Sequence, residues 1–353
     1  MSFEQCPELS VIVPVLNEGA NIAPFLRQMA LQRAVLLELI ISDGGSTDDS
    51  VAQATAQAPL LPFPLRVIDG ARGRGAQMNL GAAAARGRTL LFLHIDSRFP
   101  DPLALRQGLD AFAEAGRGGK GEVAGHFTLE FDFESQPPLP YRFYGAKARL
   151  DRPGCTHGDQ GFLIGADFFA AVGPFDTTLP LMEDNFLAER IRERGRWLLL
   201  PPVIKTSPRR FLDEGLLPRQ TLNAILMNLA ALGQLGLIRS LKETYRSQHA
   251  SSRLALAPFL APLQREIALL PQAQRRRFWY ETGAYVRSNA WQIPFFLDVC
   301  LGKTGEKGGV FLALHDRFLG RLIDHRLGNW IAAGLTWIWF RLTLRTTRAP
   351  KQF

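Results

Sequence analysis

Short apolar runs alternate with helical stretches over residues 9–94, and this pattern constrains the fold more than any other feature of the sequence. Four runs rich in β-branched and apolar residues have the length and composition of buried strands. They are Leu9–Val15, Leu36–Ser42, Leu65–Ile68 and Thr89–His94. Helices are expected between them at Asn21–Leu31, Ser46–Ala58 and Gln77–Ala85. This alternation predicts a mostly parallel α/β sheet in three layers.

The pattern changes in the second half of the chain. Glu122–Glu134 is rich in strand-forming residues, and Glu183–Arg194 is a charged stretch that Gly195 follows, which is typical of a helix and its C-cap. A strand at Trp197–Leu200 is expected to end at the two prolines that come next. Beyond Tyr245 the patterns are mainly helical. We therefore expect a sheet domain over residues 1–245 and a helical C-terminal region over residues 246–353.

The basic charge of the protein belongs to this C-terminal region. The chain has a net charge of +8, and residues 246–353 hold 16 of the 41 Lys and Arg but 6 of the 33 Asp and Glu. Trp330–Phe340 is apolar and too short to cross a bilayer, and three arginines follow it. The region suits an anionic membrane surface, or its last helix packs on the rest of the fold. No nucleic acid partner is expected.

The remaining composition indicates the compartment. Three cysteines without metal-type spacing suit a reducing environment rather than a disulfide scaffold. The N-terminus shows no basic region followed by an apolar run, so no signal peptide is expected. We expect a cytoplasmic protein, with contact to the inner membrane surface as an option.

Polar residues follow all four predicted strands. In a parallel α/β sheet, ligands bind beyond the carboxyl ends of the strands. Taken singly, each of these residues could cap a helix or form a turn, but their convergence on one edge favours a ligand site. The residues are Asn17 and Glu18 after the first strand, Asp43 after the second, Arg72 and Arg74 after the third, and His94 and Asp96 after the fourth.

His94 and Asp96 are two residues apart, so on an extended segment their side chains point to the same side. An imidazole and a carboxylate placed in this way could hold one divalent ion, Mn²⁺ or Mg²⁺, with a phosphate completing the site. The histidine could instead make a structural hydrogen bond.

Arg72 and Arg74 stand in a glycine-rich turn before a helix, where guanidinium and backbone N–H groups suit phosphate oxygens. The turn is not a dinucleotide fingerprint, because Met78 stands where the third glycine would be.

Two further polar segments are candidates for chemistry. Glu183 and Asp184 open a predicted helix, where they could complement the helix dipole or supply a general base for an incoming hydroxyl. The turn at Gly158, Asp159 and Gln160, together with Glu183, could position the acceptor or the donor sugar, or the turn could be a plain one.

In combination, the stretches SVIVPVLNE, SDGGSTDDS, LLFLHIDS and LPLMED resemble family 2 glycosyltransferases with a GT-A fold, over about Leu9–Tyr245. The sequence most resembles a bacterial subgroup described as radical-SAM/selenodomain-associated transferases. The resemblance implies an inverting transfer from a nucleotide sugar, usually UDP-linked. It also implies roles for individual residues: Pro14, Asn17 and Glu18 as base and ribose contacts, Asp43 as the reader of the uracil ring, Arg74 and Asn79 near the diphosphate, Asp96 as the metal ligand, and Asp184 as the base.

The sequence departs from this family at three places. Gly44 replaces the second Asp of the usual Asp-Asp-Gly-Ser, and His94 replaces the first Asp of Asp-x-Asp, which puts the metal in doubt. No Gln-x-x-Arg-Trp motif follows Asp184, which argues for a single transfer rather than polymerisation. Two other functions stay open, a nucleotidyltransferase and a non-catalytic sensor of nucleotide sugars. The sequence does not identify the acceptor.

Overall fold

The computed structural model describes residues 6–119, 121–179, 181–248, 253–305 and 308–348. Contacts within the chain divide it into two compact units. The first comprises Met1–Thr178 and Met182–Ser207, and the second comprises Leu179–Leu181 and Pro208–Phe353. The boundary expected after residue 245 falls inside the second unit, so the compact units divide earlier in the chain than the basic region begins.

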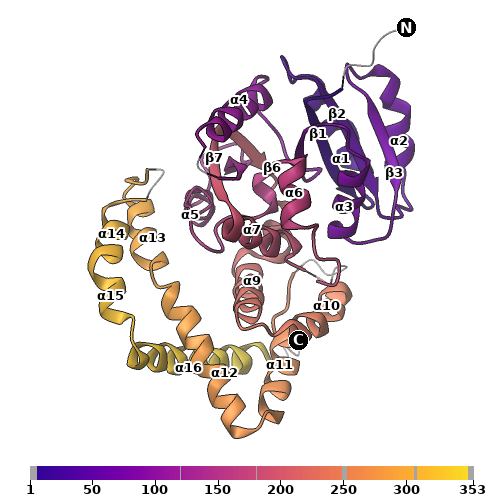
Figure 1. Ribbon diagram of the computed structural model, residues 1–353. Helices are drawn as coiled ribbons and strands as arrows, with labels where there is room; N and C mark the ends of the chain where they lie inside the picture. The colour runs from indigo at the N-terminus through magenta and orange to yellow at the C-terminus, as the bar shows by residue number, and fades with distance from the viewer. Residues whose placement is uncertain (1–5, 120, 180, 249–252, 306–307, 349–353) are drawn as a thin grey trace. The chain divides into compact units, whose positions relative to one another are not determined.

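The first unit is built on a seven-stranded sheet with the order β3-β2-β1-β4-β6-β5-β7 (Figure 1). Its strands are β1 Leu9–Val15, β2 Leu37–Asp43, β3 Leu65–Asp69, β4 Thr89–Phe92, β5 Val123–Phe131, β6 Phe162–Gly165 and β7 Arg196–Thr206. The pairs β1–β2, β1–β4, β2–β3 and β5–β7 are parallel, and β6 runs antiparallel to both of its neighbours. The mostly parallel sheet expected from the sequence is confirmed.

Helices cover both faces of this sheet. They are α1 Gly19–Ala30, α2 Ser50–Gln57, α3 Arg74–Ala84, α4 Ala104–Arg117, α5 Leu139–Lys147, α6 Ala166–Val172 and α7 Glu183–Arg194, with short 3₁₀ turns η1 Ala58–Leu60 and η2 Gly158–Gln160. One apolar core joins the sheet to α1, α2 and α4, and a second core joins it to α3, α6 and α7. The three-layer arrangement is therefore confirmed.

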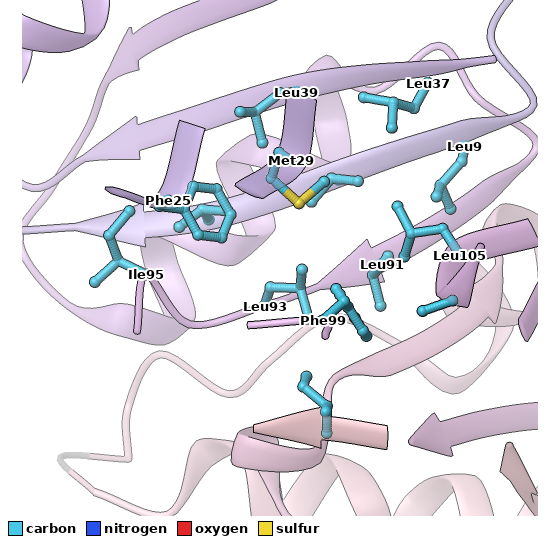
Figure 2. Packing of buried hydrophobic residues seen from close by; sticks show 14 of the residues in the cluster. Leu9, Phe25, Met29, Leu37, Leu39, Leu91, Leu93, Ile95, Phe99 and Leu105 are labelled. Carbon is cyan, nitrogen blue, oxygen red and sulfur yellow. The ribbon is translucent and has the colours of Figure 1, made fainter. Parts of the chain in front are cut away.

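The first core shows how the strands are held. Alternate residues of β1 and β2 point into this core, and each is at most 3% exposed. They are Leu9, Val11, Val13 and Val15 of β1, and Leu37, Leu39 and Ile41 of β2. Figure 2 shows Phe25 and Met29 of α1 among Leu39 of β2 and Leu91 of β4. Burial of this kind favours folding by about 1.5–3 kcal/mol for each large apolar side chain.

Helix α3 lies unusually close to the sheet. A Cβ atom on Gly81 would come within 2.3 Å of Ile12 Cγ2, so only glycine fits at this crossing. The close approach fixes the N-terminus of α3, and with it Arg74, beside the carboxyl ends of β1 and β2. The helix begins three residues earlier than the sequence predicted, at Arg74 rather than Gln77.

One strand prediction is wrong. β7 does not stop at Pro201 and Pro202 but continues to Thr206. β7 is an edge strand, and its pairing with β5 shifts register between Phe127 and Thr128, opposite the prolines. An edge position and a bulge both relieve the missing N–H of proline, which is why the strand can continue.

The second unit is helical in its described part, as expected. Its elements are α8 Arg209–Glu214, α9 Leu216–Ala231, α10 Leu235–Gln248, α11 Ala257–Leu269, α12 Gln272–Ser288, α13 Gln292–Cys300, α14 Val310–Leu314, a π turn at His315–Leu319, α15 Gly320–Ile323 and α16 Arg326–Arg348. Within the residues that the structure describes, no helix combines the length and apolar character needed to cross a membrane.

Candidate functional site

The loops after β1 and β2 are tied to each other at the carboxyl edge of the sheet. Asn17 adopts a left-handed conformation with φ 55°, and its Oδ1 accepts a hydrogen bond from the Thr47 N–H at 2.8 Å. The Asn17 N–H donates to Ser46 Oγ and the Glu18 N–H donates to Ser50 Oγ, both at 2.8 Å. Residues other than glycine rarely adopt a positive φ, and those that do often lie at functional sites. The two loops thus form one rigid rim.

Asp43 shapes this rim with its own carboxylate. The residue is 3% exposed, and its Oδ2 accepts hydrogen bonds from the N–H groups of Gly45 and Ser46 at 2.8 Å each. Its Oδ1 accepts from Ser46 Oγ at 2.5 Å. Pro14, the other expected nucleotide contact here, pairs with Ser42 near the end of β1.

Gln77 joins α3 to the same edge, and the sequence reasoning missed it. Its Nε2 donates to the Val15 carbonyl at 2.7 Å and to the Ser42 carbonyl at 2.8 Å. A Cβ atom on Gly44 would lie 2.9 Å from Gln77 Cδ. The Gln77 amide therefore occupies the space that a side chain at position 44 would need, and this explains the glycine in place of the expected second Asp.

A cluster of charged side chains lies where α3 meets α7. The Arg74 Nε donates to Glu183 Oε1 at 2.5 Å, with 35% of the Arg74 side chain and 6% of the Glu183 side chain exposed. Burial alone would lower the pKa of Arg74, but Glu183, Asp184 and Asp159 raise it above its usual value. The cluster therefore keeps one permanent positive charge among three carboxyl groups.

His94 connects this arginine to Asp159. Its Nδ1 lies 2.9 Å from Asp159 Oδ1, and its Nε2 lies 3.5 Å from Arg74 Nη1. Burial would raise the pKa of Asp159, but the hydrogen bond and charge interactions with His94, together with His157 and Arg74, hold that pKa well below its usual value. Asp159 is thus an anion that fixes the orientation of the His94 ring.

Asp184 is held in place by backbone N–H groups. Its Oδ2 accepts from the Gly158 N–H at 2.7 Å and its Oδ1 accepts from the Asn185 N–H at 2.9 Å. A Cβ atom on Gly158 would lie 2.9 Å from Asp184 Oδ2 and 3.0 Å from His94 Nε2, so a glycine is required there. Met182, just before the helix, has φ 68°, which sets the angle at which α7 begins.

A small cavity of about 10 Å³ lies against Asp184 and His94. Its other lining residues are Met78, Phe92, Gly158, Phe162 and Phe175. A space of this size is close to the smallest that can hold one water molecule. The apolar side chains keep bulk water away from one side of the carboxylate.

The residues expected to hold a metal fit that role only in part. Among the described residues, no group of three or more His, Cys, Asp or Glu side chains is placed to hold a metal ion. A metal at His94 would need the lone pair of Nε2, and that atom faces the Arg74 guanidinium. His94 therefore does not suit metal binding in this arrangement, and the expectation of a metal rests on Asp96, which is half-buried after β4.

Two of the expected site residues serve other contacts, and a third lies exposed. The Asn79 amide exchanges two 2.8 Å hydrogen bonds with the backbone of Phe175. Gln160 is 0% exposed, and its Nε2 donates to the Ala148 carbonyl at 2.6 Å. Arg72 is exposed in the turn before α3. The structure thus brings together Arg74, His94, Gly158, Asp159, Glu183 and Asp184 as one group, and Asn17, Glu18 and Asp43 as another.

Comparison with known proteins agrees with this architecture. Residues 10–165 match the family model described as "Glycosyl transferase family 2". This segment, just under half of the chain, resembles a family 2 glycosyltransferase domain. It contains β1 to β6 and the rim at Asn17 and Asp43, whereas Glu183 and Asp184 lie beyond it. The sheet, its helices and the helical second unit together correspond to a GT-A glycosyltransferase fold with a C-terminal extension.

Curated relatives match parts of the chain. "Uncharacterized glycosyltransferase MT1564" of Mycobacterium tuberculosis (strain CDC 1551 / Oshkosh) is 28% identical over 188 residues, which are 51% of this chain and 66% of that protein. "PGL/p-HBAD biosynthesis glycosyltransferase" of Mycobacterium bovis (strain BCG / Pasteur 1173P2) is 38% identical over 91 residues, which are 26% of this chain and 36% of that protein. The matched part is thus just under two thirds of the first relative and about a third of the second.

A solved structure also aligns with the chain. It is the mannosyltransferase PcManGT from Pyrobaculum calidifontis in complex with GDP-Man and Mn²⁺. The identity is 17% and the TM-score 0.48, with 94% of this chain and 87% of that chain covered.

Proposed function

We propose that this protein is an inverting glycosyltransferase that moves one sugar from a nucleotide-sugar donor, with UDP as the expected nucleotide, to an acceptor hydroxyl. The observation that carries the proposal is the placement of Asp184. Its carboxylate is fixed by the Gly158 N–H at 2.7 Å, and it lies in the same cluster as the Arg74 cation. A positioned base next to a positive charge suits attack by a hydroxyl with departure of a diphosphate.

In the proposed reaction, Asp184 accepts the proton of the acceptor hydroxyl. The hydroxyl oxygen forms a bond to the anomeric carbon of the sugar, while the bond from that carbon to the diphosphate oxygen breaks on the opposite face. The electron pair leaves with the nucleoside diphosphate. Attack from the opposite face inverts the configuration at the anomeric carbon.

Arg74 is proposed to stabilise the charge that develops on the diphosphate. Its Nε and Nη1 contact Glu183 and His94, and a guanidinium has five N–H donors in all. Pairing with Glu183 holds the guanidinium plane in one orientation, so fewer rotamers have to be ordered when the donor binds. A divalent ion held by Asp96 and the diphosphate, Mn²⁺ or Mg²⁺, would neutralise further negative charge when bound.

The nucleotide is proposed to lie on the rim formed by the loops after β1 and β2. Asn17 and Glu18 provide the first loop, and Asp43 shapes the second through its hydrogen bonds to Gly45 and Ser46. A loop that is rigid before binding loses little conformational entropy when a base and ribose settle on it.

We also propose the wider organisation that the sequence suggests. Residues 1–245 form the catalytic part, and the basic residues 246–353 bring it to the inner face of a membrane in the cytoplasm. Membership in the radical-SAM/selenodomain-associated subgroup belongs to the same proposal.

A donor screen tests the proposed function. Purified protein is heated with a panel of nucleotide sugars, with and without Mn²⁺, and release of nucleoside diphosphate is measured in the same samples. A donor present at about 100 times its dissociation constant stabilises the folded state by about 2.7 kcal/mol. We expect a UDP-sugar to raise the unfolding temperature and to release UDP slowly into water. Stabilisation without any hydrolysis would favour a sensor, and release of pyrophosphate from a nucleoside triphosphate and a sugar phosphate would favour nucleotidyl transfer.

A further inference from the structure

The outer face of α16 is apolar and open to solvent. Leu327, Ile331, Leu335, Ile338 and Leu342 are between 49% and 64% exposed. They are spaced by three or four residues, which places them on one face of the helix. A surface helix normally directs such a face toward the core, so this stripe is the reverse of the usual arrangement.

The opposite face of α16 is already packed against α12 (Figure 1). Ala333 and Phe340 are at most 5% exposed, and the rings of Phe340 and Trp279 lie 5.8 Å apart. A Cβ atom on Gly283 of α12 would lie 2.6 Å from the Ala333 backbone nitrogen, so the two helices approach as closely as glycine allows. Turning α16 to bury the outer stripe would break this packing, and the fold therefore keeps the stripe outward.

The charged residues on α16 are all basic. The sequence from Arg326 to Arg348 holds four arginines and no aspartate or glutamate. Beside the stripe, Trp330, Trp337 and Trp339 are between 42% and 44% exposed. The Arg341 guanidinium lies 5.3 Å from the centre of the Trp337 ring. Exposed tryptophan and arginine next to an apolar stripe match the boundary between lipid headgroups and acyl chains.

Two neighbouring stretches of the same unit repeat the pattern. On α13, Ile293, Leu297 and Leu301 at its C-cap follow one another at intervals of four residues and are 46–71% exposed. A second series runs along α14, the π turn and α15, again at intervals of four residues and with 48–70% exposure. It consists of Val310, Leu314, Phe318 and Leu322. Exposed apolar stripes are thus a recurrent feature of residues 292–348.

We propose that α16 docks on an anionic membrane surface, lying in the plane of the interface with its outer stripe between the acyl chains and its arginines among the headgroups. A second copy of the chain is the less suitable occupant. A symmetric pairing of two such helices would bring together basic residues with no acidic partner on either helix. The proposal concerns the second unit alone and does not depend on the reaction proposed for the first.

Vesicle co-sedimentation of the full chain tests this docking. The probes are phosphatidylcholine vesicles with and without phosphatidylserine. We expect binding that needs phosphatidylserine and that weakens with added salt. Arg341→Gln with Arg345→Gln should weaken it by roughly 30-fold, because each basic residue near the surface contributes a factor of about five. Ile331→Asp with Leu335→Asp should abolish it, since a charge would have to enter the acyl region.

Matched controls keep the test specific. Leu60→Asp changes an 82% exposed leucine of the first unit, and Arg27→Gln with Arg33→Gln removes two exposed arginines there. These variants should bind vesicles as the unchanged protein does. The far-UV circular dichroism of all variants should be the same, because the substituted side chains are exposed. The proposal fails if the unchanged protein does not bind, if the α16 variants bind equally well, or if the aspartate variants instead split a dimer in solution.

Discussion

Replacing Gly44 with alanine tests the account of the nucleotide rim quantitatively. The new methyl group would lie 2.9 Å from Gln77 Cδ and 3.0 Å from its Nε2 and Oε1, closer than van der Waals contact allows. The amide must then move away from the Val15 and Ser42 carbonyls to which it donates. Each lost hydrogen bond costs about 1 kcal/mol, and overpacking costs about 1–3 kcal/mol. We expect Gly44→Ala to lower the free energy of unfolding by about 3–5 kcal/mol.

The double variant separates this cause from others. Gln77→Ala alone should cost about 2 kcal/mol, for the same two hydrogen bonds. With the amide gone, the methyl group at position 44 has space, so Gly44→Ala with Gln77→Ala should cost about as much as Gln77→Ala alone. Urea unfolding followed by circular dichroism measures all three. Gly116→Ala in α4, where a new Cβ meets nothing within 4 Å, is the control and should not destabilise. Costs that add to within about 0.5 kcal/mol would refute the contact between Gly44 and Gln77.

Three further substitutions in the first unit test individual contacts of His126, Asn79 and Gly158. Burial lowers the pKa of His126 to about 4. As the pH falls from 6.5 to 4, the unfolded state therefore binds a proton before the folded state does, and the free energy of unfolding should drop by about 3 kcal/mol. An equally steep fall of the free energy of unfolding with pH in His126→Gln would contradict this. Asn79→Ala should cost about 2 kcal/mol in urea unfolding, through its two lost hydrogen bonds to Phe175, and an unchanged midpoint would refute that role. Gly158→Ala should lower kcat by more than tenfold by displacing Asp184, with KM for the donor little changed, whereas equal kcat would show that the glycine is not needed.

The centre of the sheet could be predicted from the sequence because β1 and β2 are buried on both faces. β1 and β2 are nearly continuous apolar runs, and the helix between them, α1, begins and ends within two residues of the predicted Asn21 and Leu31. The course of β7 could not be predicted, because whether prolines stop a strand depends on its place at the sheet edge and on the register shift beside Phe127.

Which side chains gather at the candidate site could be predicted in part, from the ends of strands and the start of α7, whereas the contacts made by tertiary packing could not. Arg74, His94 and Asp184 were all expected, and the structure places them together. The contact of His94 with both Asp159 and Arg74 was not expected, since it joins segments 20 and 65 residues apart. Gln77 was missed because a glutamine inside a helix carries no signal of its own. The close approach of α3 at Gly81 aims it at the strand ends.

The proposed reaction rests on Asp184, and the turnover of Asp184→Asn tests it most directly. Asparagine keeps the size of the side chain but cannot accept the acceptor proton. Asp167→Asn is the matched control, because Asp167 is an exposed acid in the first turn of α6. Asparagine can accept only one of the two backbone hydrogen bonds that Asp184 accepts, so a stability loss of about 1–3 kcal/mol is expected. With the donor found by the screen and its acceptor, and at a temperature where the variant is folded, we predict that Asp184→Asn lowers kcat by about 10²–10⁴-fold, while Asp167→Asn keeps full activity. Full activity of Asp184→Asn would contradict the account.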